Sequence, residues 1–111
     1  MEKQLKSDIE VEVIFKGVSP ERLPDFEFSF YTELHQSEIF TCSKEGGQFV
    51  NCVIEESEDT TTTVVRCILE NHDLKSGRLC VLAHIKWVDA DYTDGVRNDI
   101  YRQKLNLIVK P

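Results

Sequence analysis

Apolar and polar residues alternate along most of this chain, which is the pattern of half-buried β-strands. The alternation is clearest at residues 9–15 and 26–31, where β-branched and aromatic residues fill the apolar positions. Such side chains pack well on a pleated surface. Weaker versions of the same pattern predict five further strands, near residues 38–43, 49–55, 61–70, 78–88 and 99–109.

Turn-forming residues separate the predicted strands. Ser19-Pro20 favours about one helical turn, which Pro24 ends. Gly46-Gly47 supplies the positive φ angles of a tight turn. The remaining connections are an acidic hairpin tip at 55–59, a turn at 71–77 with room for one short helical turn, and a loop at 89–98 around its Asp-Gly pair.

Seven short alternating strands in 111 residues predict an all-β protein. The expected architecture is an antiparallel immunoglobulin-like β-sandwich of about seven strands, with a small β-barrel as the alternative. Trp87 follows all four cysteines, so the Cys…Trp…Cys order of antibody domains is missing. The chain is expected to be one domain, residues 8–111, after an N-terminal extension, residues 1–7.

The net charge of −7 disfavours nucleic acid and anionic membranes as partners. Residues 1–60 carry 14 acidic and 5 basic side chains, whereas residues 61–111 carry 6 acidic and 8 basic. These charges are expected on solvated faces, with stacking of copies or of complementary subunits as the alternative. The apolar runs are too short for a membrane span, and the polar start predicts no signal peptide. The protein is therefore expected in the cytoplasm on synthesis.

The cysteines are expected to fill the core as free thiols, with disulfides or a metal site as weaker alternatives. Zinc sites usually need a closely spaced pair, which is missing among Cys42, Cys52, Cys67 and Cys80. A cysteine nucleophile needs a nearby histidine. His84 shares a predicted strand with Cys80, about 13 Å away. His35 and His72 are expected in turns.

The 89–98 loop is rich in carboxylates, which can bind Ca²⁺. Its spacing does not fit the EF-hand motif, which has glycine at the sixth position of the loop and glutamate at the twelfth. Counted from Asp89, this sequence has Asp94 and Ile100 at those two positions. An ordinary solvated hairpin loop is the simpler interpretation. An exposed tyrosine beside carboxylates suits sugar or protein contacts, and Tyr31 is also expected on a polar face. The candidate ligand-binding residues are Asp89, Asp91, Tyr92 and Asp94.

The common catalytic and nucleotide-binding motifs are missing from the sequence. We find no GxGxxG, GxxxxGK[ST], HExxH or GxSxG pattern. Enzymatic activity therefore has little support, and no catalytic residue, metal or cofactor is expected.

Four segments resemble a known group of proteins. They are residues 25–32 (DFEFSFYT), 49–52 (FVNC), 70–79 (ENHDLKSGRL) and 92–97 (YTDGVR). In this order they resemble small β-sandwich proteins of Bacteroidales phage and prophage regions. Those proteins are similar in layout to the N-terminal domain of siphophage upper baseplate proteins. The resemblance implies a virion- or tail-associated module for assembly or attachment, and it transfers no functional residue.

These observations favour a non-enzymatic structural or assembly module that acts through protein–protein contacts. The partners would be copies of the chain or virion components, and edge strands would form the contacts with them. The alternative is a binding module for glycans or cell surfaces that uses the 89–98 loop.

Overall fold

The computed structural model describes residues 1–23, 25–55 and 62–111, and these form β-strands and one 3₁₀ helix but no α-helix. The strands are β1 (Glu2–Gln4), β2 (Ile9–Phe15), β3 (Asp25–Thr32), β4 (His35–Glu45), β5 (Gln48–Val50), β6 (Cys52–Glu55), β7 (Thr63–Leu69), β8 (Gly77–Val88) and β9 (Val96–Lys110). The 3₁₀ helix η1 (Pro20–Arg22) joins β2 to β3. The prediction of an all-β protein is confirmed.

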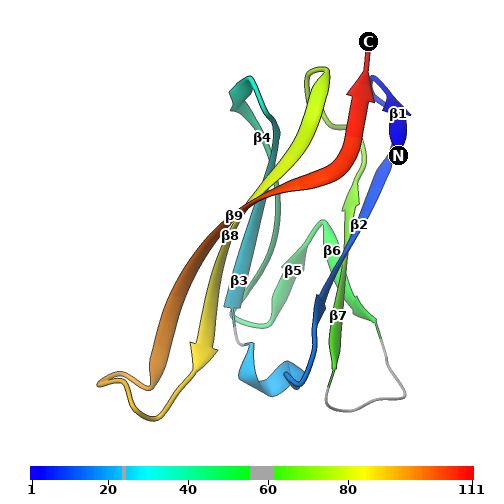
Figure 1. Ribbon diagram of the computed structural model, residues 1–111. Helices are drawn as coiled ribbons and strands as arrows, with labels where there is room; N and C mark the ends of the chain where they lie inside the picture. The colour runs from blue at the N-terminus through cyan, green and yellow to red at the C-terminus, as the bar shows by residue number, and fades with distance from the viewer. Residues whose placement is uncertain (24, 56–61) are drawn as a thin grey trace.

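The strands form two sheets of unequal size (Figure 1). Among the described residues, the larger sheet has six strands in the order β1-β9-β8-β3-β4-β5, and the smaller has three in the order β2-β7-β6. Pairing is antiparallel except between β1 and β9, which run parallel. Both chain ends lie at the same end of the molecule, because β1 pairs with the last residues of β9.

One apolar core joins the two sheets. Phe15 of the small sheet stacks on Phe28 of the large sheet with ring centroids 6.4 Å apart. Phe15 also meets Trp87 edge to face at 5.8 Å. The inward positions of the alternating strands supply the rest of this core, as the sequence pattern predicts, and Phe30 and Val65 are fully buried. Burial of these side chains is the main force that holds the sheets together.

The predicted strand at 49–55 is divided between the two sheets. Asn51 has a φ of 59°, a left-handed conformation that turns the chain from β5 into β6. Its side-chain amide donates to the carbonyl oxygen of Thr41 at 3.0 Å, and its own carbonyl accepts from the amide of Ile68 at 2.8 Å. Asparagine tolerates this conformation better than most residues, so the corner depends on it.

Other boundaries differ from the sequence prediction. The predicted N-terminal extension contains β1, whose parallel pairing with β9 no alternation could indicate. The third predicted strand, 38–43, extends over 35–45, because the turn at 33–34 is short and pairs Thr32 with His35. The last strand begins at Val96, which shortens the predicted 89–98 loop to 89–95.

The turn predictions fare unevenly. Gly46 and Gly47 have positive φ angles of 57° and 82° between β4 and β5, as a two-residue hairpin turn requires. The helical turn after Ser19 is confirmed as η1. Residues 71–76 contain no helical turn. Most of the acidic tip predicted at 55–59 lies outside the described residues.

A search of the described residues finds no helix that is both long and apolar enough to cross a membrane.

Replacement of the corner residue tests its role. Asn51→Ala forces an alanine into the left-handed region and removes the bond to Thr41, so we expect it to lower the free energy of unfolding by about 1–3 kcal/mol. Asn51→Gly keeps the φ angle without strain and should cost less. Urea unfolding followed by Trp87 fluorescence measures both. Equal stability of the alanine variant and the native protein would contradict this account.

Candidate functional site

The carboxylates predicted to bind a ligand lie in the hairpin loop between β8 and β9. Asp89 Oδ1 accepts a hydrogen bond from the backbone amide of Asp91 at 3.0 Å, and Asp94 Oδ1 accepts one from the amide of Val96 at 3.1 Å. The backbone closes the same loop, since the amide of Asp89 donates to the carbonyl of Gly95 at 2.9 Å. These carboxylates therefore stabilise their own turn, as aspartates often do.

Arg97, the second residue of β9, places a cation beside this loop. Arg97 lies 3.4 Å from Asp89 Oδ2 and 3.1 Å from Asp99 Oδ2, and its guanidinium stacks on Trp87 at 5.6 Å from the ring centroid. Tyr101 also donates to Asp99 Oδ2, at 3.3 Å. The arginine neutralises part of the negative charge that would attract Ca²⁺.

The structure brings all four candidate residues into this turn, in which the amide of Tyr92 donates to the carbonyl oxygen of Asp89 at 3.2 Å. The side chain of Tyr92 is half exposed. Within residues 1–23, 25–55 and 62–111, no group of three or more His, Cys, Asp or Glu side chains is placed to hold a metal ion. Ligand binding by this loop stays a prediction.

Tyr31 lies on the face of β3 opposite Phe28 and Phe30, as predicted, but the expectation that it is exposed there is wrong. Its side chain is 6% exposed. Arg102 covers it from β9, with the guanidinium carbon 5.9 Å from the ring centroid and Nη1 donating to the phenol oxygen at 3.0 Å. The two residues are 71 positions apart, so local alternation could not reveal the contact.

One of the three histidines is buried and hydrogen-bonded to backbone groups, and the other two are exposed on strands. His72 lies in the predicted turn but is buried; its Nε2 is 2.7 Å from the carbonyl oxygen of Ser7, and its Nδ1 accepts from the amide of Leu74 at 3.2 Å. This geometry fits the tautomer with hydrogen on Nε2. His35 begins β4 instead of lying in a turn, and it is exposed together with His84.

All four cysteines are buried and free, as predicted from their strand positions. Cys52 faces Cys67 across β6 and β7, and its thiol donates to the carbonyl oxygen of Ser43 at 3.3 Å. Burial raises the pKa of the Cys52 thiol to about 11. A hydrogen bond with Cys42, together with burial, raises the pKa of Cys67. Burial also raises the pKa of Cys80. The shifts disfavour the reactive thiolate.

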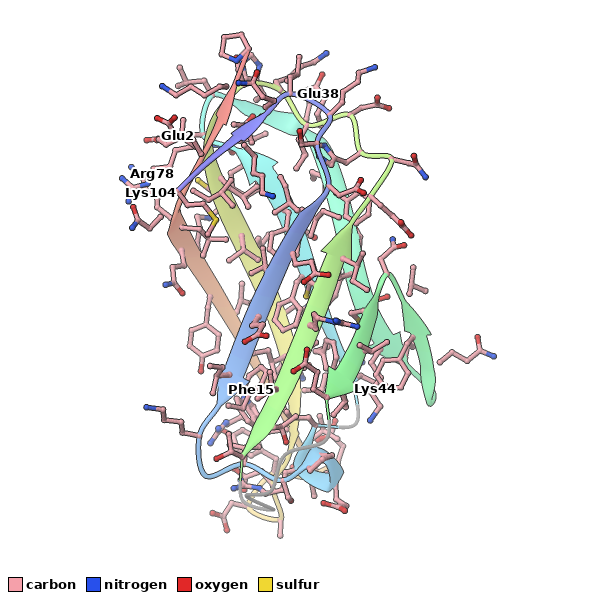
Figure 2. The ribbon with its side chains drawn as sticks, turned by 90° about the vertical axis from the view of Figure 1, so that its right-hand side faces the viewer. Glu2, Phe15, Glu38, Lys44, Arg78 and Lys104 are labelled. Atoms are coloured by element: carbon pink, nitrogen blue, oxygen red, sulfur yellow. The ribbon has the colours of Figure 1, made fainter. Side chains whose placement is uncertain are left out.

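The sequence did not indicate a groove that lies beside the core. A groove of about 500 Å³ separates β2 from β9, and inward side chains of β3 and β8 form its floor. Phe15, labelled in Figure 2, lines it at one end of β2. β2 and β9 diverge away from the chain ends (Figure 1), which leaves this side of the core open.

Burial along the strands locates the open side. The inward residues of β7 are fully buried, whereas Val11, Val13 and Phe15 of neighbouring β2 are only partly buried. On β9, the inward residues Leu107 and Val109 are buried near β1, but Tyr101 is 50% exposed farther along. Side chains of core type are thus left half covered along the groove, although Ile9 at the start of β2 is fully buried.

Comparisons with models of protein families, with curated proteins and with solved structures give no match for this chain.

The pKa of Cys52 predicts an alkaline loss of stability. The folded protein holds this thiol protonated to about pH 11, whereas an unperturbed thiol ionises near pH 9.0. The unfolded chain therefore loses the proton first, and stability falls as the pH rises between these values. Melting temperatures from pH 8 to 10.5 should drop more steeply in the native protein than in Cys52→Ala. The two proteins differ only at residue 52, so parallel curves would count against this assignment.

Proposed function

We propose that this chain is a non-enzymatic assembly module with an immunoglobulin-like fold that works through protein–protein contacts. Within that class we propose a tail- or baseplate-associated protein of a phage or prophage. The second step rests on the resemblance of the four sequence segments at 25–32, 49–52, 70–79 and 92–97.

The strand order supports the immunoglobulin-like assignment. In chain order, β2 to β9 match strands B, C, C′, C″, D, E, F and G of a variable-type domain. The small sheet, β2-β7-β6, then has the order B-E-D. The large sheet from β9 to β5 has the order G-F-C-C′-C″. Strand A, which flanks B in immunoglobulin domains, has no equivalent beside β2 in the described residues.

Exposed apolar side chains on edge strands are the observation that carries the assembly role. Phe49 and Val50 of edge strand β5 are 42% and 51% exposed, and Ile14 of edge strand β2 is 53% exposed. Ile100 on the long strand β9 is 67% exposed. Single exposed apolar residues are common, but on sheet edges they accompany free backbone groups to which another chain can add.

The chemistry of the described residues supports a non-enzymatic role. Burial raises the pKa of Cys52 and Cys80, and both thiols donate to backbone carbonyls rather than to a base. The buried histidine, His72, is likewise occupied by backbone partners. Groups used in this way stabilise the fold and are poor nucleophiles or bases.

Association measurements test the proposal. Sedimentation of the purified chain should reveal self-association, or co-purification should reveal a stable complex with a protein encoded beside it. Edge contacts of this kind bury apolar surface, so the complex should survive moderate salt. A strict monomer that binds none of the neighbouring gene products would overturn the assembly role.

A further inference from the structure

The outer edge of β2 has the properties of a docking site for one strand. β2 pairs with β7 on one side only, and no other described strand flanks it. A strand at a sheet edge presents backbone N–H and C=O groups at alternate residues, and an added strand satisfies them. β2 offers seven residues for such pairing.

The groove beside this edge would accept the inward side chains of an added strand. It lies between β2 and β9 and has an apolar floor formed by Phe28, Phe30, Ala83 and Ile85. The inner faces of both flanking strands are incompletely covered there, as the exposure of Tyr101 and the partial burial of Val13 demonstrate. Alternate residues of a strand point to one face, so about every second residue of the occupant would be apolar.

Charge on the outer face of β2 determines which residues of the added strand would alternate with its apolar ones. Glu10 and Glu12 are exposed and adjacent on this face. Arg66 of β7 lies opposite Glu12 but pairs with Glu55, and neither Glu10 nor Glu12 forms an ion pair within the described part of the chain. Directly opposed cross-strand residues of opposite charge attract, and like charges repel. The net charge of −7 adds a general attraction for a cationic segment.

We propose that β2 binds, in trans, an extended segment of a partner protein in which apolar residues alternate with Lys or Arg. Its apolar side chains fill the groove against β8 and β9, and its cations lie beside Glu10 and Glu12. This inference rests on the proposed assembly role and specifies the partner's chemistry and the strand that receives it.

Synthetic peptides provide the direct test. The probe is a capped peptide of alternating lysine and valine, about eight residues long to match β2. We expect saturable binding that raises the melting temperature. Amide protons of β2 should also exchange more slowly when the peptide is bound. A peptide of the same composition with its lysines grouped in one half is the control for non-specific cationic attraction. Equal binding of the two peptides would overturn the proposal.

A matched pair of variants tests whether the peptide binds at β2. Glu10→Lys/Glu12→Lys should weaken the alternating peptide about tenfold, because two attractive cross-strand contacts become repulsive. Glu27→Lys/Glu45→Lys makes the same change in net charge at exposed residues of the large sheet. It should change affinity by less than about twofold. Equal loss in both variants would overturn docking at β2.

Alternative occupants and positions give distinct outcomes. Preferential binding of a glutamate–valine peptide would indicate the edge of β9, near Arg102 and Lys104, and would overturn the proposal. Self-association of the native chain that slows amide exchange in β2 would show that a second copy occupies this edge, and it would overturn the proposal of a foreign strand. A partner complex that survives this variant would refute docking at β2 while leaving the assembly role intact.

Discussion

In the described part of the chain, a sheet of three strands cannot cover the inner face of a sheet of six strands, and this mismatch determines much of the structure. The aromatic contact of Phe15 with Phe28 and Trp87 fixes where the small sheet lies on the large one. Beyond that contact the large sheet extends past β2. The uncovered strip becomes the groove, and the residues along it remain half buried although their alternation is that of core side chains.

The sequence predicted strands well where alternation alone decides their position. β7 and β8 bury the residues that their period indicates, and Cys42, Cys52 and Cys67 follow the same rule. β2 has the same period, but its residues Val11, Val13 and Phe15 are only partly buried. The sequence did not predict the structure where a contact between residues far apart in the chain determines a strand boundary or the burial of a side chain. Asn51 divides one apparent strand between two sheets, and a single asparagine is a weak signal for a left-handed corner. Tyr31 is buried by Arg102, and only the order of strands in the sheet brings them together.

The two candidate sites, the acidic loop and the groove, also differ in how far the sequence could predict them. Carboxylates were visible in the sequence, but Asp89 and Asp94 are also common turn residues, and both cap backbone amides in the structure. The groove was not visible, because the pattern of Val11, Val13 and Phe15 is that of any buried strand face. Whether such a face is covered depends on how many strands the opposite sheet supplies, and that number follows from topology.

The uneven distribution of charge along the sequence is not kept as two separate faces in the fold. The acidic first half does not form its own face, since β2 pairs with β7 and β3 pairs with β8 from the less acidic half. Glu10 and Glu12 stay adjacent on the outer face of β2, which has no described strand on its other side. In the fully overlapped antiparallel pairing of β2 with a second copy, Glu12 would face Glu12, which is repulsive. The same carboxylates attract a cationic strand, so one feature opposes self-pairing and favours a foreign partner.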